Sequence, residues 1–237
     1  MATTKSEYIA DIGHVRITKK RGVKRISMRI HSSGEVRVSQ PYYLPYSAGV
    51  YFVKSHAAWL VKQRNKIAPI TITNGMAIGK RLTLQIVDSD TIRTRLKAGT
   101  LYVYAPLQDV QNQTDAYVMA TKKAMKRALN KQAKEIIPDR VDFLARQFGY
   151  SYQSVHCKPL RSRWGSCSNK KELIFNCYIL MLPWEIIDYI IMHELSHTKH
   201  MNHSTQFWDE VASTTPDYIL LRKQLKALQP AVHAFYV

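Results

Sequence analysis

The segment from residue 193 to residue 203 constrains this chain more than any other, because it reads His-Glu-x-x-His and then adds a further histidine. His193 and His197 lie four residues apart, so on a helix both imidazoles project from one face. Two nitrogens placed in this way can bind one zinc ion, and Glu194 beside them can act as general base on water activated by the metal. The spacing predicts His203 as the third ligand, which leaves one position open, as in catalytic zinc sites.

The residues before this motif predict a helix whose buried face the histidines extend. Pro183 suits the first turn of a helix, and the following nine residues run into the motif without a break. Ile186 and Ile190 fall on the same stripe as the two motif histidines, beside a second apolar stripe. The alternative is a core helix that carries ordinary histidines near its C-terminus, where they also suit the helix dipole.

The third ligand has competitors in the sequence. Asp209 or Glu210 can serve instead of His203, as carboxylates do in thermolysin-type sites, or can orient an imidazole N–H from outside. His200 lies only three residues past His197, and its side chain is expected to point further along the helix. The metzincin signature shares the histidine spacing but has glycine at the position of His200 and needs a later methionine turn, which this chain lacks.

Several ordered blocks of the C-terminal half resemble the YgjP-like zinc metallopeptidase family, which is related to the SprT and WLM proteases. The blocks are RSRWGSCS at 161–168, LIFN at 173–176, LP at 182–183, HELSH at 193–197 and NHS-x-x-FW at 202–208, with weaker similarity at 25–30 and 56–60. By position, the resemblance implies zinc on His193, His197 and His203, a catalytic Glu194 and a polypeptide substrate. His200 departs from the pattern as an additional imidazole beside the motif.

The block from residue 161 to residue 178 supplies two further candidates. Trp164 and Gly165 indicate a tight turn, and residues 173–178 alternate as a strand does. By resemblance to zincin proteases, we expect this strand to be the sheet edge that pairs with an extended substrate. Arg163 and Asn176 are then candidates for orienting the substrate or stabilising the oxyanion. The alternative for Arg163 is a structural contact with Trp164 or with an acid.

The chain as a whole predicts an α+β fold in two domains. Residues 1–112 are expected to form a β-rich, basic N-terminal domain, and residues 113–237 a zincin-like metallopeptidase domain of helices and a small sheet. Strand-like alternation occurs at 15–18, 25–30, 35–38, 81–86, 91–94 and 101–104, and a helix is expected over 51–67. Beyond the polar stretch at 108–113, a helix is predicted over 115–137, with a second opened by Pro138.

The charge of the chain favours binding to polyanions. It carries 35 Lys and Arg against 17 Asp and Glu, a net charge of +18. Residues 1–112 hold 18 of these cations against 6 acids, so most of the excess belongs to the N-terminal part. A dense cluster, the candidate nucleic-acid contact, consists of Lys19, Lys20, Arg21, Lys24 and Arg25. The alternative is a solvated turn that keeps the protein soluble.

These observations lead to one hypothesis and one alternative. The chain is expected to be a zinc metalloendopeptidase in which Glu194 takes a proton from the attacking water. In the alternative, the basic N-terminal part binds nucleic acid. The zinc site is then either secondary to this binding, or belongs to a protease that the N-terminal part recruits to DNA. The three cysteines lack a C-x-x-C pattern and are expected to be buried thiols. Without a signal core or a long apolar run, the chain is expected to be cytoplasmic and not to span a membrane.

Overall fold

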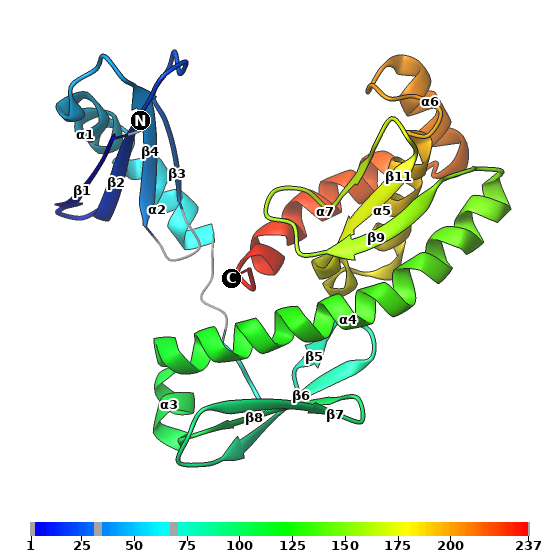
Figure 1. The fold of residues 1–237 in the computed structure, drawn as a ribbon, viewed down its shortest axis with the longest axis horizontal. Coiled ribbons are helices and arrows are strands. Elements are labelled where there is room, and N and C mark those ends of the chain that lie inside the picture. The colour runs from blue at the N-terminus through cyan, green and yellow to red at the C-terminus, as the bar shows by residue number, and fades with distance from the viewer. Residues whose placement is uncertain (1–2, 31–34, 67–70, 237) are drawn as a thin grey trace. The chain divides into compact units, whose positions relative to one another are not determined.

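The computed structural model describes residues 3–30, 35–66 and 71–236, with the side chains of residues 62–66 and 230 left out. It divides into two compact units, Met1–Pro69 and Ile70–Val237 (Figure 1). The predicted boundary near residue 112 does not coincide with this division. It falls inside the second unit, because the sheet formed by residues 77–105 packs against the long helix that follows it.

The first unit is a mixed sheet that packs against a helix. Its strands are β1 (Thr3–Ile9), β2 (Gly13–Lys20), β3 (Ser27–Ile30) and β4 (Val36–Pro41), in the order β1-β2-β4-β3. β2 and β4 are parallel, and the two outer pairs are antiparallel. Alternate residues of β2 and β4, such as Val15 and Val38, are buried, as expected for a sheet with one covered face.

Two helices follow these strands where one was predicted over 51–67. They are α1 (Tyr46–Ser55) and α2 (Ala57–Lys66), and α1 contacts β2 and β4. His56 ends α1 because its backbone leaves the helical region, with φ −112° and ψ 19°. Its ring Nδ1 lies 2.8 Å from the carbonyl oxygen of Phe52, so the side chain takes part in closing the helix end. The prediction of one unbroken helix is therefore wrong.

The second unit begins with a small mixed sheet. Its strands are β5 (Ala77–Ile78), β6 (Leu82–Asp88), β7 (Arg93–Lys97) and β8 (Thr100–Ala105), in the order β5-β6-β8-β7. β6 and β8 are parallel, and their buried residues Leu84, Leu101 and Val103 join the main core of this unit. The short helix α3 (Leu107–Asn112) leads from the sheet into the long helix.

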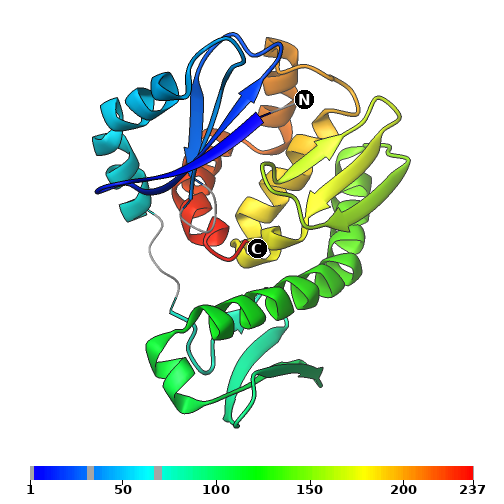
Figure 2. The same cartoon turned by 60° about the vertical axis from the view of Figure 1, so that its left-hand side comes forward.

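The long helix α4 (Asp115–Phe148) runs past both sheets of the second unit (Figures 1 and 2). The prediction that Pro138 starts a new helix is wrong, because Pro138 lies inside α4. A proline in a helix removes one backbone hydrogen bond. Here Ile136, Ile137 and Val141 are buried on either side of Pro138, and their packing holds the helix together across it.

The remaining elements build the second sheet and the three C-terminal helices. The strands β9 (Ser154–Lys158), β10 (Gly165–Cys167) and β11 (Glu172–Asn176) have the order β10-β11-β9. After a 3-10 turn, η1 (Cys177–Met181), come α5 (Trp184–Ser196), α6 (Thr205–Thr214) and α7 (Tyr218–His233). The predicted edge strand, β11, is in fact the central strand, and β10 forms the edge that contacts α5.

Two simpler expectations concern the cysteines and the membrane. Cys157, Cys167 and Cys177 are all free thiols. Cys157 and Cys177 are buried, as the sequence predicts, whereas Cys167 is only partly buried. Burial raises the pKa of the Cys157 and Cys177 thiols to about 12, so they remain protonated. None of the helices in the described parts of the chain is both long enough and apolar enough to cross a membrane.

Candidate metal centre

Helix α5 carries the histidine motif, and the predicted burial of its apolar face is confirmed. Ile186, Ile187, Ile190, Ile191 and Leu195 are all at most 3 % exposed. Pro183 occupies the N-cap, and Glu185 lies in the first turn, where the helix dipole favours an acid. Arg140 of α4 donates two hydrogen bonds to the carboxylate of Asp188, which ties α5 to the long helix. The motif is therefore presented from a firmly anchored helix.

Three histidines converge where α5 ends. One ligand atom from each of His193, His197 and His203 lies within 4.8 Å of the other two. The Nε2 atoms of His193 and His203 are 3.2 Å apart. Two imidazoles bound tetrahedrally to zinc at about 2.0–2.1 Å have nitrogens roughly 3.3 Å apart, so this pair already has the required spacing. The donor set fits a metal such as zinc.

Hydrogen bonding and burial leave these imidazoles ready to accept a metal. The Nδ1 atom of His197 lies 3.0 Å from the backbone carbonyl oxygen of His200, so it donates its hydrogen there and leaves Nε2 free. Burial, together with the neighbouring His197 and His203, lowers the pKa of His193 to about 3. A neutral ring keeps its lone pair. His200 thus contributes a backbone oxygen to the site.

Two aromatic residues of α6 form one wall of the site. The ring of Phe207 is fully buried and lies 4.4 Å from the ring centre of His197, 4.7 Å from that of His203 and 4.9 Å from that of His193. Trp208 lies 5.6 Å from His203. Both side chains therefore pack α6 against the three histidines. They also restrict the orientation of the three imidazoles.

The side chain of Glu194 on α5 lies against the edge strand β10. A Cβ atom added to Gly165 would lie 2.7 Å from Oε1 of Glu194 and 2.6 Å from its Cγ, so no larger residue fits at this position. Burial raises the pKa of Glu194 to about 8, and the positive charge of Arg163 opposes that shift. Arg163 therefore lies close enough to act on the carboxylate electrostatically. The glycine predicted to form a turn instead allows close approach to Glu194.

The alternative third ligands are used elsewhere or lie apart. Glu210 accepts hydrogen bonds at Oε1 from the hydroxyl of Tyr150 and from Nζ of Lys199, both at 2.6 Å. It joins the end of α5 to α6, and the hydrogen bond from Lys199 holds its pKa below the usual range. Asp209 is exposed and does not belong to the histidine group, the one candidate metal cluster among the described residues.

Asn176 has a different environment from the predicted one. Its side chain is buried, and Nδ2 lies within 3.0 Å of the carbonyl oxygens of Leu160 and Arg163 and of the hydroxyl of Tyr236. Its Oδ1 accepts hydrogen bonds from the backbone N–H groups of Leu160 and Tyr178. The amide thus holds the loop that precedes β10 and leads to Arg163. Its predicted contact with substrate stays a prediction.

The cationic residues predicted to bind nucleic acid all lie in the first unit. The ammonium of Lys19 lies 4.7 Å from the ring centre of Tyr46 and 5.9 Å from that of Tyr42, and the guanidinium carbon of Arg21 lies 5.7 Å from Tyr42. The structure therefore brings Lys19 and Arg21 together beside tyrosines. Lys20, Lys24 and Arg25 are exposed.

Two residues near the histidines were not identified from the sequence. Arg222 of α7 lies 5.0 Å above the ring of Trp208, and its charge helps to lower the pKa of His193. Tyr189, one turn before His193, packs edge-on against that ring at 6.1 Å. Tyr189 could have been identified, because it lies four residues before His193 and so on the same face of the helix. Arg222 had none, because only tertiary packing brings α7 to this place.

Comparison with known proteins gives the family of this chain. The family profile described as YgjP-like, metallopeptidase domain matches residues 24–228. Two solved structures are similar: the metallopeptidase zymogens abylysin of Pyrococcus abyssi (27 % identity, TM-score 0.36) and jannalysin of Methanocaldococcus jannaschii (28 %, 0.33). Their alignments cover 40 % and 38 % of this chain, and 96 % and 95 % of theirs. No curated protein matches the chain. From the family match, the chain belongs to the YgjP-like metallopeptidase family.

Proposed function

We propose that this chain is a zinc metalloendopeptidase in which His193, His197 and His203 hold the metal and Glu194 is the general base. The observation that carries the proposal is the convergence of three histidine nitrogens within 4.8 Å of one another, next to a buried carboxylate. Three imidazoles leave a tetrahedral position open, as a catalytic site requires. The site lies within residues 113–237, the part that we propose to be the catalytic domain.

The metal would supply one kind of chemistry at this place. Bound by the three imidazoles, zinc acts as a Lewis acid that makes water more acidic and a peptide carbonyl more electrophilic. The chain's own contribution is to keep the imidazoles neutral and correctly turned. Burial keeps the imidazole of His193 neutral, and the backbone carbonyl of His200 fixes the orientation of the His197 imidazole.

Glu194 moves the proton in the proposed reaction. Its carboxylate would accept a proton from the attacking water and return it to the nitrogen of the leaving amine. The buried position next to Gly165 gives the carboxylate a fixed direction. Arg163, whose charge favours the ionised carboxylate, is a positioning residue in this scheme. β10 offers an edge beside α5 along which an extended polypeptide could pair.

The variant Glu194→Gln tests the mechanism. The amide has nearly the same shape but cannot accept the proton, so we expect loss of hydrolysis of a flexible polypeptide by about 100-fold or more. Zinc content and unfolding should remain close to those of the wild-type protein. Asp209→Asn is the matched control, because it makes the same acid-to-amide change at an exposed residue of α6 outside the histidine group and should leave cleavage unchanged. Full activity in Glu194→Gln would remove Glu194 from the mechanism.

A second candidate function belongs to the first unit, and one observation favours it. β2 and β4 are parallel and pair as far as Lys20 and Pro41, so Arg21 and Tyr42, which follow them, leave the sheet at the same end. Tyr43 is 76 % exposed, and Lys19 and Arg21 contact Tyr42. Cations beside exposed aromatic rings are typical of surfaces that bind single-stranded nucleic acid. We infer that this surface can recruit the peptidase to such a strand.

Salt dependence tests this second function. Binding of an unstructured oligonucleotide should weaken steeply with salt, because cations of the protein release counterions from the strand. Reversing Lys19, Lys20, Arg21, Lys24 and Arg25 to glutamate should flatten that dependence, while Tyr43→Ala should weaken binding with the salt slope unchanged. No binding at low salt would leave these cations as a solvated turn. Binding to anionic vesicles but not to the oligonucleotide would assign the surface to membranes instead.

A further inference from the structure

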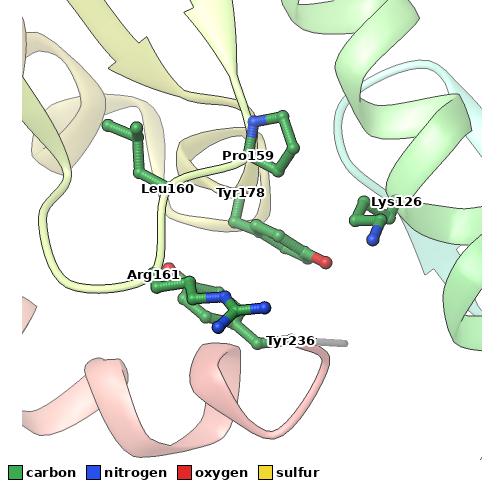
Figure 3. A pocket seen from close by; sticks show the side chains of 6 residues that line it. All are labelled: Lys126, Pro159, Leu160, Arg161, Tyr178 and Tyr236. Carbon is green, nitrogen blue, oxygen red and sulfur yellow. The ribbon is translucent and has the colours of Figure 1, made fainter. Parts of the chain in front are cut away.

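A pocket of about 230 Å³ opens in the second unit, formed by parts of the chain that are far apart in sequence. α4, the segment after β9, η1 and the segment after α7 all contribute to it. Its lining consists of Lys126, Pro159, Leu160, Arg161, Tyr178 and Tyr236 (Figure 3). None of these residues belongs to the histidine site, and none was given a role in the mechanism above.

The charged groups of this pocket are all positive. Among the residues that the structure describes, Lys126 and Arg161 are the only charged ones that line it. Neither of them takes part in an ion pair among the described residues. Two uncompensated cations that face one concave site favour an anionic occupant. Figure 3 shows the hydroxyl of Tyr178 pointing toward Lys126, with Arg161 among the other side chains that line the pocket.

The tyrosines add a neutral hydrogen-bond donor. The hydroxyl oxygen of Tyr236 accepts a hydrogen bond from Nδ2 of Asn176 at 2.9 Å, so its own hydrogen remains available. Tyr178 donates to the carbonyl oxygen of Phe235 at 3.3 Å. Burial raises the pKa of both tyrosines, which therefore stay protonated. The two rings lie 4.3 Å apart and form one apolar wall.

We propose that this pocket binds a single anionic group, a carboxylate or a phosphate, through Lys126, Arg161 and the hydroxyl of Tyr236. An Arg guanidinium is suited to such planar or tetrahedral oxyanions, and Lys adds a point charge. The volume accommodates one such group and leaves room for the chain that carries it. The source is either a free phosphate or the carboxylate of a polypeptide.

The pocket is connected to the catalytic region by one loop. Arg161 lies two residues before Arg163, whose charge acts on Glu194. The buried amide of Asn176 holds this loop at Leu160 and Arg163, and the same Nδ2 contacts Tyr236. An anion bound to Arg161 would therefore restrain the loop that brings Arg163 to Glu194. This would make the pocket a means of ordering the catalytic region.

Titration of the full-length protein with inorganic phosphate, and separately with acetate, tests the proposal by calorimetry. We expect saturable binding of at least one of the two anions. The double variant Lys126→Gln/Arg161→Gln should weaken it by about tenfold or more, because it removes two charge-assisted hydrogen bonds. Tyr236→Phe, which keeps the ring, should weaken it less. Lys123→Gln is the matched control, since Lys123 lies on the same helix but does not line the pocket.

The proposal fails if neither anion binds, or if Lys126→Gln/Arg161→Gln binds as well as the wild-type protein. His203→Ala separates this result from the metal site, because it should leave binding at the pocket unchanged even if the proposed metal site is wrong. Tighter binding of phosphate identifies a phosphate ligand. Tighter binding of acetate, and of a peptide with a free C-terminus over its amidated form, identifies a polypeptide carboxylate.

Discussion

Residues 1–69 and residues 70–237 use their side chains in contrasting ways. The described part of the first unit has eight buried apolar core residues, whereas that of the second has 35 in one cluster. The first unit carries 13 Lys and Arg against 3 Asp and Glu, and the second 22 against 14. A small core leaves most side chains in water, where charge acts on partners at a distance. A large core can hold imidazoles and a carboxylate away from water, where their pKa values change.

The largest effect is expected from His203→Ala, which tests whether the metal belongs to the second unit alone. Removing a direct ligand should weaken zinc binding by more than about 100-fold, since loss of even an outer partner costs 10- to 100-fold. Zinc competition with a chelating dye measures this. Oligonucleotide binding by the first unit should not change. If the variant keeps its affinity while Asp209→Ala loses it, the third ligand is Asp209.

Alanine at a glycine of each unit gives a matched pair. Gly165→Ala would place a methyl group against the Glu194 carboxylate, so we expect turnover to fall by about 100-fold, as small displacements of a catalytic group can cause. Gly22→Ala has open space around it but a φ of +78°, which costs about 1–2 kcal/mol of stability. Its turnover should be unaffected. Equal turnover of the two variants would contradict the close approach of β10 to Glu194.

The stability of the metal-free protein should depend on pH through the second unit. The pKa of Glu194 is about 8 in the folded protein, against 4.5 for the ordinary group. Its contribution to the free energy of unfolding is therefore complete below pH 4.5 and is lost as the pH rises towards 8. The lowered pKa values of His193 and His197 oppose this slope only below about 6.5. Between pH 6.5 and 8, unfolding free energy should fall by up to about 1.4 kcal/mol per unit.

Urea unfolding followed by tryptophan fluorescence measures that slope. Trp59→Phe removes the one tryptophan of the first unit, so the remaining signal comes from Trp164, Trp184 and Trp208 of the second. Glu194→Gln should abolish the decline between pH 6.5 and 8, because glutamine does not titrate. A slope that persists in this variant would have to come from another group.

The smallest effect concerns Arg163, which is exposed and therefore screened by solvent. Its charge lowers the pKa of Glu194, so Arg163→Gln should raise that pKa. The acid limb of kcat/KM, which reports the free enzyme, should then move to higher pH. Arg163→Lys keeps the charge and should show a smaller change. A limb that stays in place in both variants would indicate a purely structural arginine.

The parts of the fold that were predictable share local causes. Strand alternation, the start of α5 at Pro183 and the i, i+4 histidine pair are all properties of neighbouring residues, and the structure agrees with them. Pro138 shows the limit of this reasoning. Its local preference is to begin a helix, but buried residues on both sides keep α4 continuous. The packing of a sheet on α4 likewise joins residues 77–105 to the helices in one compact unit, and the two compact units divide at residues 69–70.

The site shows the same limit. His193, His197 and His203 could be proposed from spacing, because a short turn returns the chain to the helix end. β10 could not be recognised as the edge strand, because it has only three residues. A glycine is needed at position 165 because the side chain of Glu194 on α5 lies against it, and no local sequence pattern indicates this contact. Asn176 was a candidate for substrate contact because it lies in the strand expected to pair with substrate, yet its partners come from residues 160, 163, 178 and 236.

The continuity of α4 has a consequence for how the second unit opens. The side chain of Gln132 on α4 accepts hydrogen bonds from the backbone N–H groups of Lys80 and Arg81 and donates to the carbonyl of Ile78. Nζ of Lys80 donates in turn to the carbonyl of Leu182, just before α5. The β5–β6 turn, α4 and the start of the histidine helix are therefore joined. A metal that stabilises α5 should slow amide hydrogen exchange in β6 and β8, remote from the ion, because these segments share one cooperative unit.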